Sequence, residues 1–351
     1  MQSSIALHKV KKVSFLRRFK KKLLLLFRLT NAPVIKVYNG YGNREVLVIF
    51  GHTLKLSSMP RKTYRKNFVT NFFSMLRSFM VKPYPNAIIK LQWDQEYYEA
   101  KSGDDGFFRF EWKPEKIIKP GKYAVKLNLW NEGAVVAEAT GDVYIPDENK
   151  YAIISDIDDT FLISHSSNIH RRLYVLLTKN AHSRKPFEGV VDHYTLLAKA
   201  GIKSGAINPF FYVSSSEWNL YEFLIEFARK YELPDGIFLL SQIKKLHKLF
   251  FTGQGKHSAK YMRIVRIVEA FPNQQLILMG DDSQQDPYIY LSLARHFPGK
   301  ICCVYLRKHK KNYSAIKEVV DKIEKSGVPC CYFSHSSEAI AHSRKIGLIS
   351  D

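Results

Sequence analysis

The chain has 351 residues, a formal net charge of +22 and 46% hydrophobic residues. This length exceeds what one hydrophobic core usually holds, so it predicts two domains. In the basic N-terminal quarter, the apolar run from Leu23 to Phe27 is only five residues long, which excludes a transmembrane helix there. Arg28 truncates any signal-peptide core, so we expect a cytoplasmic protein that is not exported.

Residues 1–30 form a basic amphipathic segment. Residues 1–93 contain nineteen Lys and Arg residues against one acidic residue, Glu45, so most of the excess charge lies in this quarter. On a helical projection, large apolar residues such as Phe15 and Phe19 lie opposite the charges of Arg17 and Lys21. This pattern favours peripheral attachment to an anionic membrane surface.

Two other interpretations of this segment are a helix packed on the protein's own domain and a nucleic-acid-binding arm. The sequence contains no zinc-ligand spacing, no aromatic stacking motif and no other nucleic-acid-reading module beside the segment. We therefore expect no nucleic-acid partner.

Residues 43–146 show the period-two alternation of half-buried strands. Examples are the stretches 87–93 and 123–130, and turn sequences such as Asp104-Asp105-Gly106 separate the strands. This pattern predicts an N-terminal all-β sandwich domain.

From residue 151 to residue 351, strands alternate with helical stretches, which is typical of a parallel α/β domain. The interval 161–207 is too long for a simple crossover between two strands, so we expect it to include a small helical cap. No internal repeat, P-loop or dinucleotide fingerprint is present.

The first strand of this domain, the apolar run 151–154, leads directly into Asp156-Ile157-Asp158-Asp159-Thr160. Ligands of parallel sheets collect beyond the carboxyl ends of the strands, so both spaced carboxylates are expected to project there. Asp156 is a candidate nucleophile toward phosphorus, and Asp158 is a candidate acid/base. Two carboxylates repel a phosphate dianion, which predicts a divalent cation, and oxygen ligands favour Mg²⁺.

Two further strands are expected to bring polar groups to the same edge. The run 208–213 ends at Ser214, whose hydroxyl is suited to a phosphate oxygen. The run 275–279 leads into Gly280 and Asp281, with Asp286 five residues later. Between these strands, Lys256 and Lys260 precede an amphipathic helix, and one of the two ammonium groups is expected to bridge the nucleophile and the phosphate charge.

From Asp156 to Arg307 the sequence resembles the actin-patch-type phosphatidate phosphatases, a branch of the haloacid-dehalogenase superfamily that is distantly similar to lipins. The resemblance extends beyond the carboxylates to the segments 178–180, 184–190, 212–214, 218–221, 280–281, 285–290 and 304–307. It implies a Rossmann-like parallel sheet of haloacid-dehalogenase type and the Mg²⁺-dependent hydrolysis of phosphatidate to diacylglycerol.

The resemblance also implies roles for individual residues. Asp156 matches the nucleophile and metal ligand, and Asp158 matches the acid/base, with its backbone carbonyl also on the metal. Ser214 matches the phosphate-binding hydroxyl. Lys260 fits the lysine position better than Lys256, which remains a reserve.

In the last motif, Asp281 matches a metal ligand and Asp286 a supporting acid. Arg184 is suited to bind phosphate through its guanidinium group, and a structural salt bridge is the alternative for this residue.

The chain departs from the family pattern after two of these motifs. Asp282-Ser283-Gln284 replaces a sequence that often contains glycine, and Glu217 adds negative charge near the expected position of an anionic substrate. Two alternatives to phosphatidate hydrolysis therefore remain: the same chemistry on another lipid or soluble phosphate, and a lipid- or phosphate-binding module without turnover. The four cysteines are expected to be free thiols.

Overall fold

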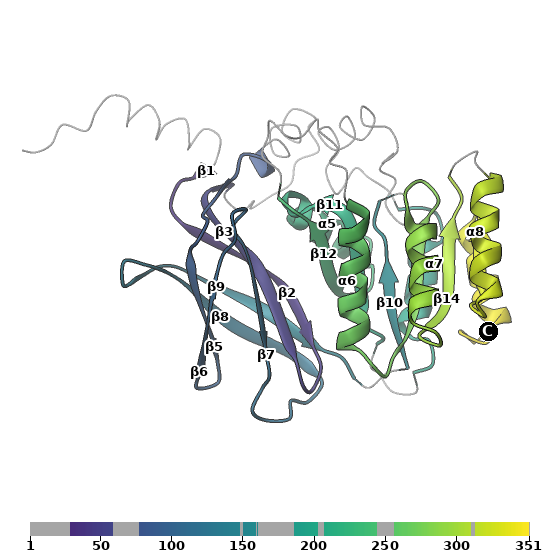
Figure 1. The fold of residues 1–351 in the computed structure, drawn as a ribbon, viewed down its shortest axis with the longest axis horizontal. Coiled ribbons are helices and arrows are strands. Elements are labelled where there is room, and N and C mark those ends of the chain that lie inside the picture. The colour runs from purple at the N-terminus through teal and green to yellow at the C-terminus, as the bar shows by residue number, and fades with distance from the viewer. Residues whose placement is uncertain are drawn as a thin grey trace, which may run out of the picture.

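The computed structural model describes residues 29–58, 77–147, 150–158, 160, 186–202, 207–243, 256–309 and 313–350, apart from the side chains of residues 256, 257 and 313. The fold is mixed α/β and contains two sheets that lie side by side (Figure 1). Within this described part of the chain, no helix is both long enough and apolar enough to cross a bilayer.

The N-terminal sheet has nine strands. Their order is β1-β3-β2-β9-β8-β5-β6, and β4 and β7 also pair with β3. All pairs are antiparallel except β2 with β9. The strands are β1 (Leu29–Thr30), β2 (Val34–Gly42), β3 (Leu47–Ser58), β4 (Lys82–Pro83), β5 (Ile88–Trp93), β6 (Glu96–Lys101), β7 (Phe107–Trp112), β8 (Gly121–Asn131) and β9 (Ala134–Ile145).

The long β8–β9 hairpin shows how local sequence determines a connection. Asn131 pairs with Ala134, so only Glu132 and Gly133 form the loop. Both have positive φ angles, 50° and 80°. This conformation matches the right-handed twist of the flanking strands, and glycine adopts it without a steric penalty.

Strand β3 is buried on both faces. Leu47 and Ile49 belong to a core formed only by the N-terminal sheet. Val48 and Phe50, which alternate with them, belong to the large core that also contains the C-terminal sheet. Because successive side chains of a strand point to opposite faces, the uninterrupted apolar run 46–50 is explained by these two cores.

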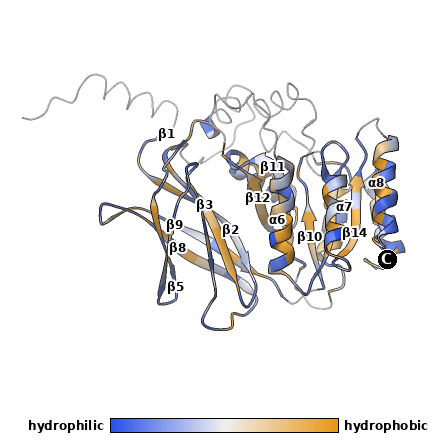
Figure 2. Cartoon of the chain, in the orientation of Figure 1, coloured by the Kyte–Doolittle hydropathy of each residue, from blue (hydrophilic) through white to orange (hydrophobic). Residues whose placement is uncertain are grey.

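The C-terminal sheet has six parallel strands in the order β12-β11-β10-β13-β14-β15. Its central strands are almost entirely buried and apolar (Figure 2), as expected for a parallel sheet covered by helices. The strands are β10 (Tyr151–Ser155), β11 (Phe210–Glu217), β12 (Gly236–Ser241), β13 (Gln275–Asp281), β14 (Ile301–Arg307) and β15 (Cys330–Phe333).

Helices connect the parallel strands. Figure 1 shows α6, α7 and α8 along one face, in agreement with contacts between successive members, and α4 packs against α9. The helical elements are α4 (Val190–Ala198), η1 (Trp218–Leu220), α5 (Tyr221–Lys230), α6 (Lys256–Ala270), α7 (Asp286–His296), α8 (Tyr313–Lys325) and α9 (Ser336–Lys345).

Aromatic side chains join the two sheets. Tyr38 of β2 stacks on Trp218 with ring centroids 4.0 Å apart, and Tyr41 contacts Phe211 of β11 edge-on at 5.4 Å. The side-chain amide of Asn43 donates a hydrogen bond to the carbonyl oxygen of Ala270 at 2.6 Å. The face of the N-terminal sheet that carries these tyrosines is therefore part of the same core as β11 and α6.

Several expectations differ from the structure. The N-terminal sheet begins before residue 43, because β1 and β2 precede that boundary. Within the interval 161–207, α4 is not a cap helix, because its buried face belongs to the core of the parallel sheet. Most of the remaining interval, residues 161–185 and 203–206, lies outside the described residues. The segment 1–28 also lies outside them. The nine strands form one hydrogen-bonded sheet. The expected arrangement of a β-sandwich remains a prediction.

Candidate active site

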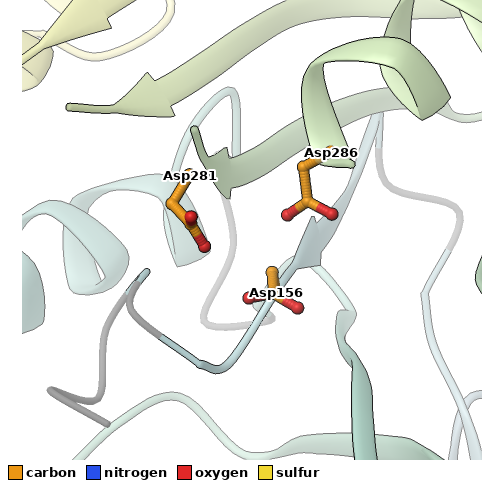
Figure 3. A group of neighbouring side chains, drawn as sticks. All are labelled: Asp156, Asp281 and Asp286. Atoms are coloured by element: carbon orange, nitrogen blue, oxygen red, sulfur yellow. The ribbon is translucent and has the colours of Figure 1, made fainter. Parts of the chain in front are cut away.

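Three buried aspartates meet at the carboxyl edge of the parallel sheet. Asp156 follows β10, Asp281 ends the neighbouring strand β13, and Asp286 begins α7. One carboxylate oxygen from each lies within 4.8 Å of the others, and Figure 3 shows the three carboxylates directed toward one another. Each residue is at most 1% exposed. Adjacent parallel strands ending at one edge account for this convergence.

Lys260 lies among these aspartates. Its Nζ atom is 2.6 Å from Oδ1 of Asp156 and 2.5 Å from Oδ1 of Asp286. Burial disfavours the charged ammonium, but the two carboxylates outweigh this effect and raise the pKa of Lys260 above its ordinary value. Lys260 lies on α6, one turn after Lys256, whose side chain is outside the described residues.

The site carries more negative than positive charge in its described part. Burial, followed by the charge of Asp286, raises the pKa of Asp281 to about 7. Burial also raises the pKa of Asp156 well above its usual value, despite the opposing effect of Lys260. Ionised carboxylates this close together require a further cation or a proton.

An oxygen-only metal site fits this arrangement. Oδ2 of Asp286 is buried and has no hydrogen-bond partner, although buried carboxylate oxygens are normally satisfied. Hard divalent cations such as Mg²⁺ prefer carboxylate oxygens. The unsatisfied oxygen and the three convergent carboxylates thus match the ligand chemistry expected from the sequence.

A hydroxyl group that the sequence interpretation did not include lies between two of the carboxylates. Oγ1 of Thr160 is 3.3 Å from Oδ2 of Asp156 and 3.3 Å from Oδ2 of Asp281. Because one hydroxyl has one proton, it donates to one carboxylate at a time. The threonine of the D-x-D-x-T pattern was the available signal for this position.

Arg307 holds the loop that carries Thr160. Its Nε atom donates to the Thr160 carbonyl oxygen at 3.1 Å, and its Nη2 atom donates to Oγ of Ser336 at 2.9 Å. The guanidinium group lies over the rings of Phe187 and Phe333, at 4.5 and 4.8 Å from their centroids. Arg307 therefore positions Thr160 through the backbone without itself contacting the aspartates.

Asp158 lies in a different hydrogen-bonding environment from Asp156. Its Oδ2 atom accepts hydrogen bonds from the hydroxyls of Ser214, at 3.0 Å, and Ser216, at 2.5 Å. The Ser214 hydroxyl also accepts a hydrogen bond from the Ser216 backbone N–H at 2.8 Å. The single Ser214 proton is thus used on Asp158 in this structure, whereas the sequence suggested that it binds phosphate.

Gly280 allows α7 to approach the end of β13. A Cβ atom at this position would lie 2.4 Å from Oδ2 of Asp286 and 2.8 Å from the Tyr290 hydroxyl oxygen. Any side chain here would displace the carboxylate, which explains why glycine directly precedes Asp281.

Glu217 and Arg184 are two further residues that the sequence singled out. Glu217 belongs to β11 and is only 3% exposed, so its carboxylate is not on the open surface where a substrate would first meet it. Arg184 lies outside the described residues.

The C-terminal half is thus an α/β domain with a buried acidic site at the carboxyl edge of a parallel sheet. Residues 151–308 match the family described as "Phosphatidate phosphatase APP1, catalytic domain". This match confirms the resemblance of the segment to the actin-patch-type phosphatidate phosphatase family that the sequence motifs predicted.

Two curated relatives show the same likeness. An uncharacterized protein of Schizosaccharomyces pombe is 23% identical over 230 residues, covering 63% of this chain and 36% of the relative. Phosphatidate phosphatase APP1 of Saccharomyces cerevisiae is 25% identical over 244 residues, covering 66% of this chain and 40% of the relative. The chain therefore aligns with less than half the length of either protein.

Among solved structures, a carbohydrate acetylesterase from Xanthomonas citri aligns with 88% of this chain and 70% of its own, at 11% identity and a TM-score of 0.31. A superposition at this level carries no information about fold or function.

Proposed function

We propose that the chain is a Mg²⁺-dependent phosphatidate phosphatase with a catalytic domain of haloacid-dehalogenase type. The observation that carries the proposal is the contact of Lys260 with Asp156 and Asp286, beside Asp281, at the carboxyl edge of the parallel sheet. The family of residues 151–308 and the name of the Saccharomyces cerevisiae relative support the choice of phosphatidate.

Asp156 and Asp281 would hold the Mg²⁺ ion, together with the backbone carbonyl of Asp158, and the unsatisfied oxygen of Asp286 is the nearest additional donor. When bound, the ion would neutralise phosphate charge and orient the phosphoryl group.

In the first proposed step, the Asp156 carboxylate forms a bond to phosphorus while the bond from phosphorus to the glycerol oxygen breaks. Asp158, in its protonated form, gives its proton to that oxygen, so diacylglycerol leaves as a neutral alcohol. Lys260 contacts the attacking carboxylate and contributes positive charge where the phosphoryl group is transferred.

In the second proposed step, Asp158 accepts a proton from a water molecule whose oxygen attacks phosphorus. The bond between phosphorus and Asp156 breaks, which releases inorganic phosphate and restores both carboxyl groups. Ser214 and Ser216 donate hydrogen bonds to Oδ2 of Asp158 and so hold this carboxyl group in one orientation. The two aspartates therefore have separate environments for separate tasks.

The test is an assay of the purified chain with Mg²⁺ against phosphatidate in mixed micelles and against a panel of soluble phosphomonoesters. We expect phosphatidate to be preferred and chelation of Mg²⁺ to remove activity. Asp158→Asn should slow turnover by ~10²–10⁴-fold, the usual contribution of general acid/base catalysis. Activity confined to soluble phosphomonoesters would reassign the substrate, and no turnover of any phosphate ester would support a binding module instead.

We also propose that the enzyme is cytoplasmic and peripherally bound to anionic membranes through residues 1–30, and that the region of the N-terminal sheet folds as a β-sandwich. Residues 1–30 contain nine Lys and Arg residues, which support the proposal of membrane binding. Each basic residue near an anionic bilayer contributes ~1 kcal/mol to the free energy of binding. Deleting residues 1–28 should weaken binding to anionic liposomes and slow hydrolysis of bilayer phosphatidate, with a short-chain soluble substrate unaffected. Equal loss on both substrates would show that the segment is needed for folding.

A further inference from the structure

A cavity lies where the N-terminal sheet meets the parallel sheet. Its volume is about 380 Å³, within the ~300–1,000 Å³ typical of small-molecule sites. Its walls come from β2, β3 and the β6–β7 region on one side, and from η1, β12 and α6 on the other. Among the described residues, none of the proposed metal ligands, nucleophile or acid/base lines this cavity.

One wall of this interface cavity is apolar. It includes the rings of Phe50, Phe107 and Trp218 and the side chains of Leu239 and Leu240. The rings of Phe50 and Trp218 are 5.6 Å apart and inclined by 55°. Together with the two leucine side chains, these rings form an apolar surface against which a hydrocarbon chain can be buried.

The remaining lining is positively charged. Arg109, Arg263 and Arg266 contribute three guanidinium groups, against a single carboxylate from Asp105. Burial, followed by the charge of Arg266, lowers the pKa of Arg263 to about 10, so it remains charged at neutral pH. Arg109 forms an ion pair with Glu111, and Arg263 donates to the Ser214 carbonyl oxygen and to Oγ of Ser241, each at 3.1 Å. Arg266 is therefore the guanidinium group of this lining best suited to donate bidentate hydrogen bonds to a bound anion, which would also relieve its repulsion with Arg263.

His52 supplies an unsatisfied polar atom at the cavity wall. The residue is fully buried, its Nδ1 atom is 3.0 Å from the Tyr38 hydroxyl oxygen, and its Nε2 atom has no hydrogen-bond partner. A buried polar atom without a partner costs about 1–3 kcal/mol. A ligand atom that reached Nε2 would recover this cost, so the cavity favours a molecule with a polar end.

We propose that the interface cavity binds an amphiphile with one anionic head group and one apolar chain. The head group contacts the arginine side chains and the chain lies along the aromatic and leucine wall. This inference goes beyond the proposed phosphatase activity, because it concerns a separate set of side chains. A free fatty acid and a single-chain phospholipid both have this chemistry.

Isothermal titration calorimetry on the full chain tests the proposal, with laurate as the probe below its micelle concentration. Dodecyltrimethylammonium has the same chain with the opposite charge, and acetate has the same head group without the chain. All titrations are repeated on Asp156→Asn, which leaves the cavity intact, so the test does not depend on whether the proposed phosphatase chemistry is correct.

Gly103→Phe is the blocking variant. Gly103 lines the cavity, and a Cβ atom there would have its nearest neighbour 3.5 Å away, so the backbone accommodates a side chain that fills the space. Arg266→Gln removes one exposed guanidinium group of the cavity, and Arg295→Gln is its matched control on α7, another exposed helical arginine that does not line the cavity.

We expect one laurate per chain, at least tenfold weaker binding to Gly103→Phe, and about threefold to tenfold weaker binding to Arg266→Gln, with Arg295→Gln unchanged. Dodecyltrimethylammonium and acetate should each bind at least tenfold more weakly than laurate. Repeating the titration with dodecyl phosphate distinguishes a free fatty acid from a single-chain phospholipid. Tighter binding of laurate indicates a carboxylate head group, and tighter binding of dodecyl phosphate indicates a phosphate head group. Equal laurate binding by the wild type and Gly103→Phe would overturn the proposal, as would equal loss in the two arginine variants.

Discussion

The two sheets of this protein bury their side chains in different ways. In the parallel sheet, all five residues of β10 are buried, whereas exposure alternates along β6 of the N-terminal sheet. A strand covered on both faces presents its polar groups only where it ends, so the aspartates of the parallel sheet are concentrated at one edge. The antiparallel strands instead distribute polar side chains along a solvated face.

The comparison also shows that the sheets are not independent. Strand β3 contributes alternate residues to a core of its own sheet and to the core shared with the parallel sheet. Chemistry is therefore concentrated in one region, while stability is distributed over both. The predictions below separate these two properties.

The largest effect is expected when the parallel-sheet edge loses its nucleophile. Asp156→Asn should reduce turnover by at least ~10³-fold, because an amide does not replace a carboxylate that bonds to phosphorus. Phosphate release from phosphatidate measures the effect. The control is Asp94→Asn in the N-terminal sheet, where the aspartate is exposed and its φ of 50° suits asparagine. Comparable loss in both variants would show that activity is not localised at the edge.

The next largest effect is expected on stability, when a side chain is removed from the core that both sheets share. Trp218 is 7% exposed and stacks on Tyr38 of the N-terminal sheet, so Trp218→Ala should lower the free energy of unfolding by ~3–5 kcal/mol. Urea denaturation followed by circular dichroism measures the change. If the sheets were independent, the variant would show a second transition, with the stability of the N-terminal sheet unchanged.

A smaller effect is expected from removing the buried cation. Lys260→Ala should lower turnover by ~10²-fold, because its ammonium contacts Asp156 and supports charge at the reacting group. Steady-state kinetics with Mg²⁺ present provide the measurement. Lys256→Ala, one turn earlier on α6, is the matched control and should differ little from the wild type; the reverse order of effects would reassign the motif lysine.

The smallest effect concerns pH and involves one histidine in each region. Burial lowers the pKa values of His52 and His193 to about 3, so both are neutral when folded and become protonated below pH ~6.5 when unfolded. The unfolded state binds more protons between these values, so stability is lost as pH falls from about 6.5 toward 3. Each histidine contributes up to ~1.4 kcal/mol per pH unit.

Denaturation of His52→Phe and His193→Phe at pH 7.5, 6 and 5 should show this dependence reduced relative to the wild type. The comparison must be with the wild type, because the raised pKa of Asp281 contributes with the opposite sign. Exposed His296→Gln is the control and should leave the dependence unchanged. A reduction in only one of the two core variants would show that the regions respond separately to acid.

The sequence by itself determined which strands carry the acidic site. The apolar run 151–154 followed by Asp156 indicated a buried parallel strand, and the run 275–279 before Asp281 indicated another, because strands covered on both faces are apolar until they end. It also indicated alternating strands within residues 43–146 of the N-terminal region. Those conclusions depend on local periodicity, which can be read along the chain.

Only the tertiary structure decided which side chains share contacts across long distances in sequence. Thr160 reaches Asp281, Arg307 holds the Thr160 carbonyl, and Ser214 donates to Asp158. The placement of β3 between two cores is of the same kind, because the run 46–50 by itself does not show what covers each face. Hydrogen bonds and cores of this type depend on packing between elements, and local sequence patterns do not encode that packing.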